Sequence, residues 1–245
     1  IYERSDVDVR GKEGLRAAVG ELAGQPPPDT ITITENDFTF QIDVRHGHKT
    51  GYYLDQRTNR AILKDVCLER AAPDTQSQQV RMLNLFSYTG AFGLYAMGGG
   101  AEYVANVDTS REALELGEAN FALNQLPVER ADFIQADVFD YLHDQVAEGA
   151  QYDVIVCDPP KFAHNAGQVE RAARGYKDLN LNCFKLMKPG GYLMTFSCSG
   201  AIDADLFQKI VFGALADSGR QAQIVKHLTQ AEDHPVALTF PEGAY

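Results

Sequence analysis

Residues 81–93 read RMLNLFSYTGAFG, and this stretch decides the fold. Its first half is a short apolar run of strand length, and its second half is a loop with a glycine before an apolar helical pattern. A strand, a loop and a helix in this order begin a β-α-β unit. Because the same alternation continues along the chain, the sequence predicts an α/β protein with a mostly parallel sheet covered on both faces.

Seven strands are expected in this part of the chain, each a short apolar run bounded by turn residues. They are Arg81–Phe86, Glu102–Asp108, Ala131–Gln135, Tyr152–Asp158, Gly191–Ser197, Ala222–His227 and Val236–Thr239. Helices are expected near residues 91–98, 110–124, 138–148, 168–188 and 203–218, the second with Thr109 and Glu112 as a capping box. The last two strands are too close in sequence for a parallel crossover, so we expect an antiparallel hairpin at one edge of a seven-stranded sheet.

Residues 1–50 differ from the part that follows. They contain the breaker-rich segment Gln25-Pro26-Pro27-Pro28-Asp29, and then two alternating stretches, residues 31–34 and 38–44, that predict a β-hairpin. A helix is expected over residues 56–70. We therefore expect a small β-containing region over residues 1–50 and an α/β domain over residues 51–245.

The acidic charge of the chain is concentrated in one block. The net charge is −12, and residues 101–160 hold 13 acids and two bases. Residues 41–70 carry six bases against four acids, and residues 161–190 carry six against two. Binding to phosphates depends on Lys and Arg. The acidity therefore weakens an RNA-binding interpretation without excluding it, although such basic stretches are also typical of solvated helix faces.

The four cysteines argue against a metal or disulfide framework. Cys67, Cys157, Cys183 and Cys198 show neither a CxxC pattern nor Cys/His ligand spacing. No apolar run reaches the length of a membrane span. These features favour a reduced cytoplasm, no metal and no membrane partner.

A cofactor site is expected at the carboxyl ends of the strands, where open α/β sheets bind ligands. The loop after the first strand offers Phe86, Ser87, Tyr88, Thr89 and Gly90. It supplies small residues where the backbone must approach a ligand. It is not the GxGxxG turn that seats a dinucleotide pyrophosphate, and S-adenosylmethionine (SAM), which has no phosphate, does not need that turn.

Acidic residues at the next three strand ends strengthen this interpretation. Asp108 can accept hydrogen bonds from ribose hydroxyls, in SAM as in NAD. Asp137, followed by Val138, can accept the adenine amino group, and Asp158 ends the fourth strand. Each acid alone can be a simple helix cap. Together with the glycine loop they favour a Rossmann-like SAM-binding domain.

Several motifs resemble one family of RNA-modifying enzymes. Asp158-Pro159-Pro160 resembles the substrate motif of SAM-dependent nucleic-acid methyltransferases. The wider pattern resembles the class I bacterial 23S ribosomal RNA (cytosine-5) methyltransferases of the RlmI type. The matching segments are Lys49–Arg57, Leu83–Gly90, Asp158–Phe162, Arg174–Asp178, Thr195–Gly200, His234–Val236 and Pro241–Gly243.

This resemblance implies further features. Members of the family begin with an RNA-binding PUA domain and a middle domain. Residues 1–50 would then be the end of the middle domain, the PUA domain would be absent from this chain, and residues 51–245 would be the methyltransferase domain. The resemblance also implies that Gln56 helps to bind SAM, that 23S ribosomal RNA is the substrate, and that the protein acts in the cytoplasm. Whether the protein forms a homodimer is left open by the sequence.

The chemistry of cytosine carbon 5 requires a covalent nucleophile, because this carbon attacks a methyl group only after a thiolate has added to carbon 6. Cys198, in the polar turn Ser197-Cys198-Ser199, is the candidate nucleophile, with a buried structural cysteine as the alternative. Asp158 would hydrogen-bond the edge of the base. Candidate substrate-binding residues are Pro159, Pro160, Lys161 and Phe162.

Some roles remain open at this stage. Phe162 would either stack on an extruded base or plug the hydrophobic core. Cys157 precedes Asp158 and is interpreted as structural, whereas Lys161, Asp158 or a water molecule would remove the carbon-5 proton. Cys67 and Cys183 are expected in the core or on the surface of helices.

Three other functions compete with this one. An enzyme that methylates an exocyclic amine of an RNA base also fits Asp-Pro-Pro followed by an aromatic residue. A Rossmann oxidoreductase is disfavoured by the missing GxGxxG. A catalytically inactive RNA-binding module is disfavoured because every expected cofactor acid is present.

Overall fold

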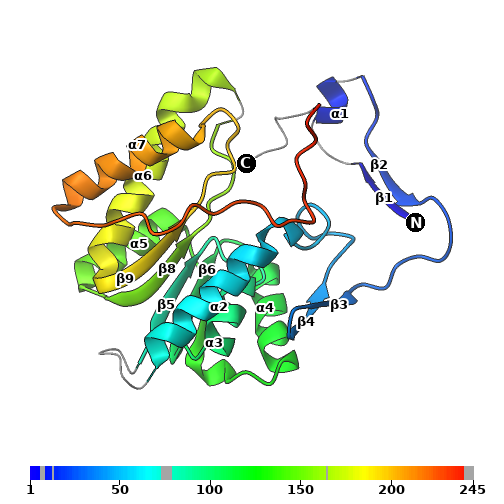
Figure 1. Cartoon of the computed structure of the whole chain (residues 1–245). Coiled ribbons are helices and arrows are strands. Elements are labelled where there is room, and N and C mark those ends of the chain that lie inside the picture. The colour runs from blue at the N-terminus through cyan, green and yellow to red at the C-terminus, as the bar shows by residue number, and fades with distance from the viewer. Residues whose placement is uncertain (6–8, 13, 73–78, 164, 240–245) are drawn as a thin grey trace. The chain divides into compact units, whose positions relative to one another are not determined.

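The computed structural model describes residues 1–5, 9–12, 14–72, 79–163 and 165–239 (Figure 1). The chain divides into two compact units, Ile1–Leu54 and Asp55–Tyr245. In the first unit, β1 (Tyr2–Ser5) pairs with β2 (Ala18–Glu21), with the short helix α1 (Val9–Lys12) between them. A second antiparallel pair, β3 (Ile31–Glu35) and β4 (Phe38–Ile42), confirms the predicted hairpin. Asn36 allows its tight turn because it adopts the left-handed conformation, with φ of 51°.

The second unit is built on one parallel sheet. Its strands are β5 (Arg81–Leu85), β6 (Tyr103–Asp108), β7 (Ala131–Gln135), β8 (Tyr152–Cys157) and β9 (Met187–Thr195). Their spatial order is β7-β6-β5-β8-β9. The chain therefore moves outward from β5 in one direction and then returns to place β8 on its other side. The carboxyl ends of β5 and β8 form the switch point at which such sheets bind ligands.

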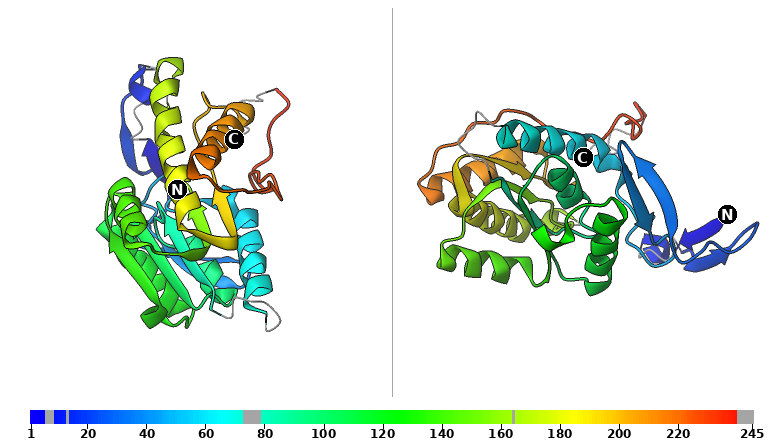
Figure 2. Two further views of the ribbon diagram at one scale, coloured as in Figure 1. Left: turned by 90° about the vertical axis from the view of Figure 1, so that its left-hand side faces the viewer. Right: turned by 90° about the horizontal axis from the view of Figure 1, so that it is seen from below.

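Helices cover both faces of the sheet, as Figures 1 and 2 show. One face carries α2 (Arg57–Ala71), α3 (Ala91–Gly98) and α4 (Arg111–Leu123). The other carries α5 (Val138–Glu148), α6 (Val169–Leu186) and α7 (Ala204–Ser218). Short 3₁₀ turns lie at Leu54–Gln56, Val128–Arg130 and Ala166–Gln168. Apolar side chains of α5 and α6, among them Leu142 and Leu179, pack against buried strand residues such as Leu83 and Ile155. The Rossmann-like α/β fold is confirmed.

The predicted edge hairpin is wrong in this structure. Residues 222–227 and 236–239 form no strand, so the parallel sheet has five strands in the described part of the chain. Ile224, Val225 and Leu238 are exposed. This segment is held elsewhere: the amide of Ala231 donates to the carbonyl of Asp55 at 2.8 Å. Local strand propensity was present, but the hydrogen-bond partners of a strand were not.

The start of α4 also differs from the prediction. Ser110, rather than Thr109, is the N-cap, and its side chain accepts the amide hydrogen of Ala113 at 3.2 Å. The register shifts by one residue because the Ser110 amide donates to Asp108 at 2.9 Å, which extends the turn after β6.

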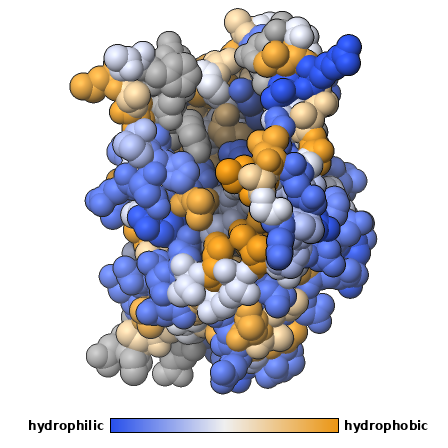
Figure 3. All heavy atoms as spheres, turned by 90° about the vertical axis from the view of Figure 1, so that its right-hand side faces the viewer, coloured by the Kyte–Doolittle hydropathy of each residue, from blue (hydrophilic) through white to orange (hydrophobic). Residues whose placement is uncertain are grey.

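Within the described ranges, no helix is both long and apolar enough to cross a bilayer. The face drawn in Figure 3 intersperses hydrophilic residues with small groups of hydrophobic ones.

Candidate active site at the carboxyl end of the sheet

The loop between β5 and α3 has an unusual backbone. Phe86, Tyr88 and Gly90 all have positive φ, at 57°, 49° and 70°. A residue with a Cβ in this region costs about 1–3 kcal/mol, and such strain concentrates at ligand sites. The loop is tied to the sheet because the Ser87 amide donates to the carbonyl of Val107 at 2.9 Å. The sequence-predicted cofactor loop is therefore a rigid structure held against the neighbouring strand.

In the first turn of α3, just after this loop, a glycine is required for packing. A Cβ on Gly93 would lie 2.3 Å from Oδ1 of Asn106, a fully buried side chain on β6. The same oxygen accepts a hydrogen bond from Asn84 at 2.9 Å. Gly93 is therefore small because α3 approaches the sheet closely, whereas the sequence suggested approach to a ligand.

Asp108 lies at the tip of β6 and faces the glycine loop. One carboxylate oxygen accepts the amide hydrogen of Tyr88 at 2.8 Å, and the other accepts that of Ser110 at 2.9 Å. Among the residues that the structure describes, no cationic side chain pairs with Asp108. A carboxylate oxygen has two lone pairs, so both oxygens keep capacity for ribose hydroxyls.

Asp137 and Val138 begin α5. One oxygen of Asp137 caps the helix, accepting the amides of Phe139 at 2.8 Å and Asp140 at 3.3 Å. Val138 is buried in the core cluster, so its side chain is turned away from solvent. The simple capping role raised by the sequence is thus present, and a role for Asp137 toward adenine would add to it.

Asp158 follows β8, and Gln56 meets it from a distant part of the chain. The Gln56 side-chain amide donates to Oδ2 of Asp158 at 3.3 Å, across 102 positions of sequence. The orientation of that amide is fixed because its oxygen accepts from Asn59 at 2.7 Å. Gln56, suggested only by the family resemblance, therefore lies beside the strand-end acid.

Cys198 lies beside the same loop. Its Sγ is 3.7 Å from the carbonyl oxygen of Pro159, the residue after Asp158. Cys198 is partly exposed, whereas Cys67, Cys157 and Cys183 are buried. A hydrogen bond with Cys183 and then burial raise the pKa of Cys157 far above that of an ordinary thiol. The structural interpretation of Cys157 and the core alternative for Cys67 and Cys183 agree with this burial.

In the loop after Pro159, the first two residues are exposed and the next ones are packed against the core. Pro160 and Lys161 are exposed and accessible to a substrate. The ring of Phe162 packs 4.9 Å from the ring of Tyr176 and 6.1 Å from that of Phe139, centroid to centroid. This packing favours the hydrophobic alternative for Phe162 over base stacking.

Two residues that the sequence interpretation did not assign organise this region. Ser199 is buried, and its hydroxyl oxygen accepts the amides of Phe162 at 3.1 Å and Ala163 at 3.2 Å. The hydroxyl of Tyr176 lies 2.9 Å from the same oxygen. Both residues stood in the matched segments around Arg174–Asp178 and Thr195–Gly200, but their partners are 23 to 37 positions away in sequence. Pro241–Gly243 lie outside the described residues.

A buried polar group without a partner in this loop is consistent with a binding site for SAM. The hydroxyl of Ser87 is buried and has no hydrogen-bond partner within the described chain. A buried polar group without a partner is costly, and a bound polar ligand is one explanation for it. This group, the loop with positive φ angles and the Asp108 carboxylate occur together at the switch point.

Comparison with known proteins agrees with this geometry. The family model described as S-adenosylmethionine-dependent methyltransferase matches residues 12–238. The chain belongs to this family. Its cofactor is therefore SAM.

Relatives with closer similarity carry a more specific name. The chain is 51% identical over 246 residues to the ribosomal RNA large subunit methyltransferase I of Tolumonas auensis, and 49% identical over 245 residues to that of Aeromonas salmonicida. Each alignment covers 100% of this chain and 59% of the relative. The chain thus spans under two thirds of the length of these relatives.

Solved structures support the fold and the cofactor. A structure from Streptococcus mutans, described as a SAM-dependent methyltransferase, has a TM-score of 0.78 at 26% identity, over 94% of this chain and 56% of that one. A crystal structure of the methyltransferase SMU.776 contains S-adenosylhomocysteine and has a TM-score of 0.77 at 26% identity, over 93% of this chain and 57% of that one.

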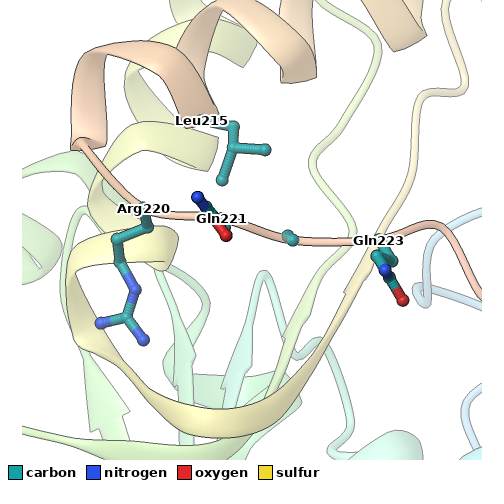
Figure 4. Close-up of a pocket in the computed structure, with 5 residues that line it drawn as sticks. Leu215, Arg220, Gln221 and Gln223 are labelled. Carbon is teal, nitrogen blue, oxygen red and sulfur yellow. The ribbon is translucent and has the colours of Figure 1, made fainter.

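One surface hollow lies away from these groups. It has a volume of about 460 Å³ and is lined by Leu215, Arg220, Gln221, Ala222 and Gln223, beyond the end of α7 (Figure 4). None of the strand-end residues lines it. In the described ranges, no group of three His, Cys, Asp or Glu side chains has the arrangement of a metal site.

Proposed function

We propose that the protein transfers a methyl group from SAM to carbon 5 of a cytosine in large-subunit (23S) ribosomal RNA. The family membership supports the methyl donor, and the names of the relatives support the RNA substrate. The observation that carries the cytosine-5 chemistry is the 3.7 Å approach of the partly exposed Cys198 sulfur to the Pro159 carbonyl, next to Asp158. A nucleophile and an acid at adjacent strand ends are what this reaction requires.

The proposed reaction starts with addition of the Cys198 thiolate to the base and ends with its release. Its thiolate adds to carbon 6, which makes carbon 5 nucleophilic. Carbon 5 then bonds to the methyl group that SAM supplies, and S-adenosylhomocysteine is the leaving group. A base removes the carbon-5 proton, and the electrons of that C–H bond re-form the carbon 5–carbon 6 double bond as the thiolate leaves.

Asp158 would hold the edge of the cytosine during these steps. Protonation of the ring nitrogen N3 accompanies addition of the thiolate, and a carboxylic acid hydrogen-bonded to this edge can supply the proton. N3 returns this proton to the carboxylate when the thiolate leaves. Gln56 fixes one oxygen of Asp158, at 3.3 Å, and so orients the other. Lys161, exposed two residues beyond Pro159, is a candidate for the base that removes the carbon-5 proton.

The remaining assignments follow from the same proposal. Lys161 and other basic residues of the stretches 41–70 and 161–190 would supply cations for binding the RNA phosphates. Residues 1–50 would end a middle domain, residues 51–245 would form the catalytic domain, and the enzyme would act in the cytoplasm.

A covalent trap tests the mechanism. RNA in which 5-fluorocytosine replaces the target base should form a stable adduct with Cys198, because fluorine at carbon 5 cannot be removed as a proton. Mass spectrometry of the digested adduct should locate the bond at Cys198. Formation of methylated product without any adduct would contradict the covalent step.

A second candidate function is methylation of an exocyclic amine of an RNA base. Asp158-Pro159-Pro160 with an aromatic residue at position 162 favours it. Such an enzyme would not use the thiol, so Cys198→Ala separates the two. The variant should lose cytosine methylation if the thiol is the nucleophile, and should retain methylation if the target is an amine.

A further inference from the structure

Tyr176 is a buried tyrosine to which the proposed function gives no role. It lies in α6, and its side chain is fully buried. Its ring packs 4.9 Å from the ring of Phe162 and edge-on, at 5.5 Å, against Phe207 of α7. Contacts on both sides fix the position of its hydroxyl group. A buried hydroxyl needs a hydrogen-bond partner, and that of Tyr176 lies next to Cys198.

The partner is Ser199, the residue after Cys198. The Tyr176 oxygen lies 2.9 Å from Oγ of Ser199. Ser199 is joined in turn to the residue before Cys198, since its amide donates to Oγ of Ser197 at 3.3 Å. The turn that carries Cys198 is therefore held by Tyr176 through Ser199.

Counting donors and acceptors fixes the direction of this hydrogen bond. A serine hydroxyl has one proton and two lone pairs. Both lone pairs of Ser199 are occupied by the amides of Phe162 and Ala163. The Ser199 proton is therefore donated to the Tyr176 oxygen.

We propose that Tyr176 is a positioning residue that fixes the Cys198 thiol relative to Asp158. The Ser199 hydroxyl joins the turn after β9 to the amides of residues 162 and 163, which follow Asp158 in the loop after β8, and the Tyr176 hydroxyl holds that serine in place. Tyr176 thereby supports the link between the two strand ends that must act on the same base. The role of Asp158 in this inference rests on the proposed function, whereas the effect on the thiol does not.

The charged state of the site is compatible with this role. Burial raises the pKa of Tyr176, and a negative charge on Cys198 raises it further, against the lowering effect of the two serines. The Tyr176 hydroxyl therefore stays protonated when the thiol ionises.

The test uses Tyr176→Phe, which keeps the packed ring and removes only the hydroxyl. Tyr152→Phe is the matched control: Tyr152 is also buried, lies at the opposite end of β8, and bonds to Gln145 at 2.9 Å. Small misplacement of reacting groups costs about a hundredfold in rate, so kcat for methylation should fall about ten- to a hundredfold in Tyr176→Phe, with KM for SAM unchanged. A kcat equal to that of the control would overturn the proposal.

A second readout needs no RNA and separates the two hypotheses. The contact with the Pro159 carbonyl favours the protonated thiol, because the carbonyl accepts a hydrogen bond from that form. Loosening the turn should therefore raise the alkylation rate of Cys198 by iodoacetamide several-fold at pH 7 in Tyr176→Phe, and not in Tyr152→Phe. An unchanged alkylation rate contradicts the positioning role even if methylation of cytosine is established. If alkylation of Cys198 is faster in Tyr176→Phe but the Cys198→Ala variant still methylates RNA fully, the proposed function is contradicted and the positioning role of Tyr176 is not.

A pair of serine variants covers the case in which Tyr176→Phe does not fold. Ser199→Ala removes the hydroxyl that bonds to Tyr176, and Ser199→Thr keeps it. The first should reproduce the loss of kcat and the faster alkylation, and the second should restore both toward wild type. Equal behaviour of the two variants would show that the hydroxyl has no positioning role.

Discussion

Strand β8 has an aspartate at each end, and the surroundings of these two residues differ. Asp153, at the amino end, is fully buried and meets Lys188 at 2.7 Å, Arg70 at 3.3 Å and the amide of Arg81 at 2.9 Å. Asp158, at the carboxyl end, is half-buried and accepts the neutral amide of Gln56. The first carboxylate is compensated by cations and holds β8, β9 and α2 together. The second keeps access to solvent, as a substrate-binding group must.

The cysteines follow the same division. Cys67, on α2, lies close enough to Arg70 and Asp153 to respond to their charges, and burial raises its pKa to about 12. Cys198 is partly exposed at the other end of the sheet. The amino end of the sheet therefore serves stability, and the carboxyl end carries the reactive groups.

The largest effect expected from this contrast is in thiol reactivity. At pH 8, a thiol with a pKa of about 12 has roughly a thousandfold less thiolate than an ordinary thiol, and the buried sulfur of Cys67 is also shielded from reagents. Iodoacetamide should therefore modify the partly exposed Cys198 about a hundredfold faster than Cys67, or more. Peptide mapping after timed alkylation measures both rates. Comparable rates would mean that the two ends are not chemically distinct.

The second effect is in stability. Asp153→Ala leaves Lys188 and Arg70 without their buried partner, and breaking a buried pair costs about 3–5 kcal/mol. Chemical denaturation should show this loss in the free energy of unfolding. The matched control is Asp132→Ala, because Asp132 is an exposed aspartate on β7. A loss below about 1 kcal/mol for Asp153→Ala would place the stabilising role elsewhere.

The third effect is in cofactor affinity. Hydrogen bonds to a charged group contribute about 1.5–3 kcal/mol, so Asp108→Ala should weaken SAM binding about ten- to a hundredfold. The free energy of unfolding should change less than in Asp153→Ala. Isothermal titration calorimetry gives the affinity, and binding equal to wild type would remove Asp108 from the ribose site.

The smallest effect concerns backbone strain. Gln125, in the turn after α4, has φ of 56°, like Tyr88 in the cofactor loop. Gln125 is exposed, so Gln125→Gly should relieve strain and stabilise the protein by about 0.5–1 kcal/mol without changing SAM binding. A thermal melt compares the variant with wild type. Reduced SAM binding in Gln125→Gly would show that strain outside the cofactor loop also matters for function.

Much of this architecture was predictable because it depends on local signals. The helices at residues 91–98 and 138–148 were predicted with the bounds that the structure has, since a glycine and an aspartate mark their starts. The parallel strands were predicted because their apolar runs are short and regularly spaced.

The parts that could not be predicted depend on partners far away in sequence. The expected strands at residues 222–227 and 236–239 needed an edge to pair with, and the segment is held by the start of α2 instead. The ion-paired cluster of Asp153, Arg70 and Lys188 joins three elements, and nothing in the pattern of any one of them indicates it. For the same reason the sequence suggested Cys198 and Asp158 but not the link through Tyr176 and Ser199.

One side chain near the start of α2 has a practical consequence for protein engineering. Asn59 donates both to Gln56, at 2.7 Å, and to the carbonyl of Thr229, at 3.2 Å. The segment after the last helix is thereby fastened next to a residue that contacts Asp158. A minimal fragment cut after α7 would keep every strand of the sheet and still release this support, so a recombinant catalytic fragment should extend at least through Ala231.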